Sequence, residues 1–155
     1  MNAYLEASGA VLEELLDSLA ELVRPLDGGT LNWSPLPEGT NSIAALVGHT
    51  VGSTASWLAR ATGEVAPRDR DAEFRARATS EDLTRLIERC QTEVRRRLSL
   101  LDGLDPAGKQ SVHRIRGDVD AEVTAAWCLE HAIVHAGEHW GQIQLTAQLC
   151  RSRPT

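Results

Sequence analysis

Apolar side chains recur at steps of three and four residues along three long stretches of this chain. The clearest run lies at about Ser80–Leu101, and two others extend over about Ala3–Val23 and Ile43–Thr62. This repeat gathers apolar side chains on one face of an α-helix. Each helix must therefore bury one face against another element, which favours a helical bundle.

Capping residues and helix breakers mark the ends of these helices. Pro25 ends the first helix, and Asn41 or Ser42 is suited to cap the second. Thr79 and Asp82 resemble a capping box for the third, with Asp where Glu is usual. The boundaries agree with the apolar repeat, so the three helices are predicted on two independent grounds.

The segments between the helices are of two kinds. Residues 27–41 are rich in glycine and proline and predict a long irregular loop. The segment Glu64–Ala78 is dense in charge and predicts a connector across the bundle. Val112–Gly117 reads as a short extended piece before a fourth helix.

We expect the fourth helix to begin at Asp118 or Asp120 and to end near Leu149. No convincing pair of strands is evident. Four long helices in 155 residues predict a single all-α domain over residues 1–155. Its expected architecture is a four-helix bundle of the up-and-down type with long crossover loops.

Charge and hydropathy exclude several classes of partner. A net charge of −6 and a pI near 5.3 argue against nucleic acid, which requires clustered positive charge. No leader and no long apolar run is seen, so a cytoplasmic protein without a membrane partner is expected. Cys90, Cys128 and Cys150 lie far apart, which predicts buried free thiols in a reducing compartment.

The fourth helix carries His131, His135 and His139 at four-residue intervals. Such residues share one helix face, and this polar strip lies between two apolar clusters, so we expect it to point into the bundle. Three imidazoles at this spacing climb about 12 Å, so only an adjacent pair can bind one ion. His49 on the second helix, near the margin of its apolar face, is a candidate third nitrogen ligand.

Three ligands with open positions are typical of catalytic metal sites. A histidine strip satisfied by packing alone, in a bundle that only dimerises, is the alternative without metal. Glu138 and Glu130 are candidates for an orienting or proton-transfer role, and by helical angle Glu138 lies nearer the histidines. The residues between His131 and His135 lack the glutamate of the HExxH motif, so a zinc protease is unsupported.

The segment from His135 to Ile143, HAGEHWGQI, resembles the HxxxHRGQI ending of the DinB-like superfamily. That superfamily comprises four-helix bundles and includes bacillithiol- and mycothiol-dependent S-transferases. The stretch from Trp33 through Pro35 to His49 resembles the family's W-x-P loop, which leads into a helix with an inward histidine. Trp140 stands where the family often has arginine.

The resemblance implies that His49, His135 and His139 bind a divalent metal ion, with zinc or nickel expected. His131 then lies outside the triad, as a supporting neighbour. The catalytic residues stay unassigned, with Glu138 and His131 as candidates for support. The family's frequent pairing is compatible with a homodimer.

The function expected from this resemblance is a metal-dependent thiol S-transferase that acts on a small electrophile. The partners would be a small-molecule substrate and a low-molecular-weight thiol. Lys109 is the only lysine beside many arginines, which hints at a GC-rich genome and makes mycothiol a thiol to test. Whether the protein is an enzyme stays open: a non-catalytic metal-binding or stress-associated protein and a metal-dependent hydrolase are the alternatives.

Overall fold

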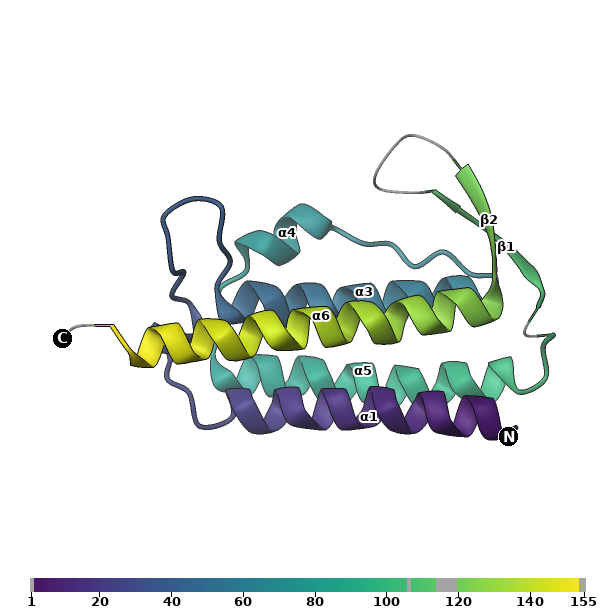
Figure 1. The fold of residues 1–155 in the computed structure, drawn as a ribbon, viewed down its shortest axis with the longest axis horizontal. Coiled ribbons are helices and arrows are strands. Elements are labelled where there is room, and N and C mark those ends of the chain that lie inside the picture. Colours follow the sequence, from purple (N-terminus) through teal and green to yellow (C-terminus); the bar gives the residue numbers. More distant parts are fainter. Residues whose placement is uncertain (1, 106, 114–119, 154–155) are drawn as a thin grey trace.

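Four long helices lie side by side in the computed structural model, which describes residues 2–105, 107–113 and 120–153 (Figure 1). The helices are α1 (Ala3–Val23), α3 (Ile43–Ala61), α5 (Ser80–Leu101) and α6 (Ala125–Arg151). The predicted all-α bundle is confirmed.

Helix direction follows from the connections (Figure 1). The chain reverses between α1 and α3, and again between α5 and α6. Between α3 and α5 it returns along the length of the bundle, so these two helices run parallel and are joined by a long crossover. α6 packs chiefly on α3 and α1 chiefly on α5. The bundle thus sets α3 antiparallel to α6, and this pair carries all the candidate metal ligands.

Two predicted caps are present. The Ser42 side chain caps α3 by accepting a hydrogen bond from the backbone N–H of Ala45, at 3.2 Å. Thr79 and Asp82 form a reciprocal capping box at the start of α5. α3 ends just before Gly63, whose φ of 79° suits glycine.

Both long connections contain a short helix that the sequence analysis did not predict. α2 (Gly28–Leu31) interrupts the loop expected to be irregular, and α4 (Arg70–Arg75) lies in the crossover. An aspartate caps each one: Asp27 accepts from Thr30 N–H and Asp69 from Ala72 N–H. A cap that satisfies the first turn outweighs poor helix propensity over so short a span.

The expectation of no strand pair was wrong, and α6 begins later than predicted. Lys109–His113 (β1) pairs antiparallel with Asp120–Thr124 (β2). Asp120 therefore lies in a strand, and Thr124 caps α6 by accepting from Trp127 N–H. The two strands pair with each other through cross-strand hydrogen bonds, and neither strand carries an apolar pattern that predicts it by itself. Asp118 and residues 114–117 of the expected extended piece lie outside the described residues.

Aliphatic side chains from all four long helices fill the core. The largest fully buried ones include Leu12, Leu16, Leu19, Ile43, Leu58, Ile87, Leu129 and Ile143. Cys90, Cys128 and Cys150 are buried and free, as predicted. None of the described helices is both long enough and apolar enough to cross a membrane.

One apolar flank of the histidine strip is not part of this core. Val134 and Leu145 are more than half exposed, whereas Leu129 and Ile143 on the other flank are buried. The strip therefore has buried apolar surface on one side only, contrary to the expectation of apolar surface facing the bundle interior on both sides. The strip instead lies along the α3–α6 contact, with one edge open to solvent.

Candidate metal centre

Histidines from α3 and α6 meet midway along the α3–α6 contact. His49 is 3% exposed, and His135 and His139 are half-buried. The Nε2 atoms of His49 and His135 lie 3.3 Å apart. One ring nitrogen from each of the three residues falls within 4.8 Å of the others. The structure thus brings together the three residues expected to bind metal.

One pair of these nitrogens already has the spacing of two metal ligands. Zinc–nitrogen bonds of about 2.0–2.1 Å in a tetrahedral site place ligand nitrogens about 3.3–3.4 Å apart. The distance between the Nε2 atoms of His49 and His135 has this value. Within the described parts of the chain, no further histidine, cysteine or carboxylate belongs to the group. The three histidines can therefore hold a divalent ion and leave coordination positions open.

The protonation states also suit a metal ion. Burial is the main cause that lowers the pKa of both His49 and His135 to about 3. The nearby charge of Arg68 and the histidine neighbours act in the same direction. Neutral imidazoles are the form that binds metal. The contact of His49 with Glu73 is therefore a hydrogen bond from a neutral ring, although its distance meets the criterion for an ion pair.

The Nδ1 atoms of His135 and His139, both on α6, differ in their hydrogen-bond partners. Nδ1 of His139 lies 2.8 Å from Oε1 of Gln142, an acceptor, so Nδ1 donates and Nε2 keeps its lone pair. Nδ1 of His135 is buried and has no hydrogen-bond partner in the described structure. A buried unpartnered nitrogen is costly. A strong bond at the other nitrogen of His135, such as a metal supplies, would offset that cost.

The crossover contributes contacts that the sequence analysis missed. Arg68, Glu73 and Phe74 all contact His49. They belong to the charge-dense segment interpreted only as a connector. This segment has no helical periodicity that would predict which of its side chains face the bundle. It is also far from α6 in the sequence, so no motif links it to His135 and His139.

His131 and Glu138 lie beside the triad in different settings. The ring of His131 forms a cluster with Trp57 and Trp127, whose ring centroids lie 4.4 and 4.8 Å away. It lies 6.0 Å from the ring of His135. Glu138 is exposed on α6. A supporting role for either residue stays a prediction.

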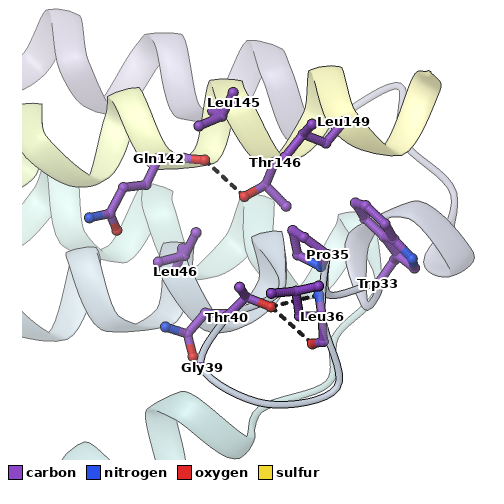
Figure 2. Close-up of a pocket in the computed structure, with 11 residues that line it drawn as sticks. Trp33, Pro35, Leu36, Gly39, Thr40, Leu46, Gln142, Leu145, Thr146 and Leu149 are labelled. Carbon is purple, nitrogen blue, oxygen red and sulfur yellow. Dashed lines mark hydrogen bonds between the residues drawn. The ribbon is translucent and has the colours of Figure 1, made fainter. Parts of the chain in front are cut away.

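An open cavity of about 680 Å³ lies one helical turn from the triad. Gln142, which contacts His139, stands at one end, and Trp33 stands at the other (Figure 2). Two hydroxyl groups in the wall are already bonded to the backbone: Thr146 donates to Gln142 O, and Thr40 contacts both N and O of Leu36. The lining is mainly apolar, with Trp33, Pro35, Leu36, Leu46, Leu145 and Leu149.

A second cavity, of about 430 Å³, has a different character. Arg60, Arg68 and Arg70 line it together with Trp57 and with apolar residues such as Val65 and Pro67. Arg68 contacts His49, and Trp57 contacts His131. Each cavity, the apolar one and the cationic one, is therefore lined by at least one residue that contacts a histidine.

The fold is therefore a helical bundle in which three histidines converge in a group that could hold a metal ion with open coordination positions. The family model described as the DinB superfamily matches residues 11–143, and the chain belongs to this superfamily. The implied ligands His49, His135 and His139 all lie in the bundle as that membership leads one to expect.

A solved structure supports the fold over the whole chain. A crystal structure described as a conserved protein from Enterococcus faecalis is similar, with a TM-score of 0.75 over 99% of each chain. The two sequences are 16% identical, so this likeness concerns the fold alone. No curated protein matches the sequence.

Proposed function

We propose that this protein is a metal-dependent transferase that joins a low-molecular-weight thiol to a small electrophile. The proposal rests on one observation above the others: Gln142 and Arg68, which contact histidines of the triad, line two separate cavities, and only one of these cavities carries arginines. A transferase that joins its two substrates directly must bind both at once. A hydrolase needs a cavity for only one substrate besides water.

The two cavities suit two kinds of molecule. The larger, apolar cavity has the size and character typical of small-molecule sites and would take the apolar body of an electrophile. The cavity lined by arginines would take an anionic thiol, because guanidinium groups bind carboxylate and phosphate well. Zinc or nickel is the ion expected in the triad.

In the reaction, the thiol loses its proton to solvent at the open edge of the site, and its sulfur forms a bond to an electrophilic carbon. The leaving group departs with the bonding electron pair. A divalent ion held by three neutral imidazoles would act as a Lewis acid that lowers the pKa of a bound thiol. Gln142 orients His139, and the apolar wall of the larger cavity would contact the body of the electrophile.

The chain's own thiols are poor candidates for the nucleophile. Burial raises the pKa of Cys90 to about 12 and that of Cys128 to about 11. Cys150 is also buried. The thiolate is the reactive form, and the environments of Cys90 and Cys128 suppress it. An external thiol is therefore required.

The test is turnover of 1-chloro-2,4-dinitrobenzene with mycothiol, bacillithiol, glutathione or coenzyme A. Protein stripped of metal and protein reloaded with zinc or nickel are compared, and formation of the thioether is followed by absorbance. We expect a rate with at least one thiol that requires the metal and is lost in His49→Ala.

The other outcomes identify the alternatives. Metal binding that raises the melting temperature, without turnover of any thiol, would favour a non-catalytic metal-binding protein. Metal-dependent cleavage of p-nitrophenyl acetate without thiol transfer would favour a hydrolase. Either result would contradict the transferase.

A further inference from the structure

The crossover holds the edge of the His49 ring that faces away from α6. Oε2 of Glu73 lies 3.1 Å from Nδ1 of His49, and the Glu73 side chain is only 15% exposed. The ring of Phe74 stacks on the imidazole, with centroids 4.3 Å apart and an angle of 28° between the planes. These contacts fix both the position and the tilt of the ring.

The hydrogen bonds made by Arg68 identify the tautomer of His49. Nη2 of Arg68 lies 2.7 Å from Oε2 of Glu73, 3.2 Å from the backbone oxygen of His49 and 3.1 Å from His49 Nδ1. This nitrogen carries two hydrogens, and the two oxygens accept both. Nδ1 must then keep its own hydrogen and donate it to Glu73. The lone pair of His49 is left on Nε2, the nitrogen that faces His135.

Arg68 in turn fixes the carboxylate. Its Nε donates to Oε1 of Glu73 and its Nη2 to Oε2, both at 2.7 Å. Two parallel charge-assisted hydrogen bonds hold a carboxylate in one plane. Glu73 therefore has a defined orientation toward His49.

Gly52 provides the space that this carboxylate occupies. It lies on α3, three residues after His49, and a Cβ at this position would overlap Oε1 of Glu73. The same Cβ would lie 2.9 Å from Cδ of Glu73 and 3.4 Å from Nε of Arg68. Glycine weakens a helix interior relative to alanine, so its presence here needs a local reason. Accommodation of Glu73 is that reason.

We infer that Glu73, held by Arg68 and seated on Gly52, is a positioning residue of the metal centre. Histidines that bind metal commonly donate their other ring N–H to a carboxylate, which fixes the tautomer and strengthens the ligand. Through Glu73, α4 and the crossover become part of the centre. This inference rests on the metal-binding part of the proposed function and is independent of thiol transfer.

The experiment measures zinc affinity by competition with a chromophoric chelator, together with the melting temperature of the metal-free protein. The variants are Glu73→Ala, Glu73→Gln and Gly52→Ala. Gly141→Ala on α6 is the matched control, because a Cβ there meets open space.

Glu73→Ala and Gly52→Ala are each expected to weaken zinc binding about 10- to 100-fold, the range for loss of such a partner. Glu73→Gln should lose less, because its amide oxygen still accepts the Nδ1 hydrogen. Gly141→Ala should bind zinc as the unaltered protein does. The metal-free melting temperature should fall in Glu73→Ala, which loses the ion pair with Arg68, and should fall less in Glu73→Gln, which keeps an acceptor oxygen.

Several results would overturn the inference. One is unaltered zinc affinity in both Glu73→Ala and Gly52→Ala. Another is a loss of zinc affinity that is equal in Glu73→Ala and Glu73→Gln and that accompanies an equal fall in their metal-free melting temperatures, which would indicate a general structural role. If the unaltered protein binds no zinc, the metal centre itself fails, whereas zinc binding without turnover removes only the transferase.

Discussion

The Nε2 atoms of His49 and His135 lie 3.3 Å apart, although 86 positions separate the two residues in the sequence. Two neutral imidazoles at this distance either share one hydrogen or share an ion. The antiparallel pairing of α3 and α6 creates this relationship, and His139 completes the group one turn along α6.

The first prediction concerns metal content. Purified protein should contain close to one equivalent of zinc or nickel by elemental analysis. His49→Ala, His135→Ala and His139→Ala should each lose more affinity than the ~10–100-fold typical of a supporting partner. His131→Ala should lose less than any of these three.

One experimental result would directly contradict the assignment of the three ligands. If His131→Ala abolished binding while His139→Ala did not, the register of the site on α6 would be wrong. Protein that contains no metal and takes up none would favour a bundle whose histidines are satisfied by packing alone.

The second prediction concerns pH. The pKa of His49 and of His135 is about 3 in the folded protein, below the ordinary value of 6.5. Between these values the unfolded chain binds more protons than the folded one, so protonation favours unfolding. The stability of metal-free protein should therefore be full above about pH 6.5 and fall as the pH drops toward 3.

Thermal unfolding in the presence of a chelator, at intervals from pH 7.5 to pH 4, measures this dependence. His135→Gln removes one of the two groups and should show a shallower decline. Superimposable pH profiles for the two proteins would show that His135 does not contribute.

The third prediction assigns a different substrate to each of the two cavities. Leu145→Gln alters the apolar cavity, and Arg60→Gln alters the cationic one. In the transfer assay, Leu145→Gln should raise KM for the electrophile about tenfold, the effect of a lost apolar contact of roughly 1–3 kcal/mol. Arg60→Gln should instead raise KM for an anionic thiol about tenfold, as expected for a lost charged hydrogen bond.

Steady-state kinetics with each substrate varied in turn gives both constants. Arg89→Gln, a change of the same kind at a residue that lines neither of these two cavities, serves as the control. The assignment fails if both variants raise KM for the same substrate.

The fourth prediction concerns stability away from the site. The Arg97 side chain is nearly buried and donates to Glu93 within α5 and to Thr62 and Glu64 at the end of α3. Arg97→Ala should lower the free energy of unfolding by about 2 kcal/mol, because it removes several charged hydrogen bonds at once.

Urea unfolding measures this loss, and Arg95→Ala is the matched control. Arg95 pairs with Glu13 across α1 and α5, but both side chains are largely exposed. Its loss should cost at most about 1 kcal/mol. Equal effects for the two variants would show that the buried network does not stabilise the bundle.

The sequence by itself determined the long helices and several of their ends. An apolar repeat, a capping serine and a capping box act over a few residues, so their meaning does not depend on the rest of the chain. The four-residue spacing of His135 and His139 likewise placed both on one face of a helix wherever that helix packs. These parts of the prediction were local, and the structure agrees with them.

Only the tertiary structure decided what surrounds those histidines. The crossover places Glu73 beside His49, and the packing of α3 on α6 places His49 opposite His135. A strand pair precedes α6, which therefore begins at Ala125. It also left one side of the histidine strip open to solvent. These outcomes depend on packing and hydrogen bonds between residues far apart in the chain, and no pattern within a few residues encodes them.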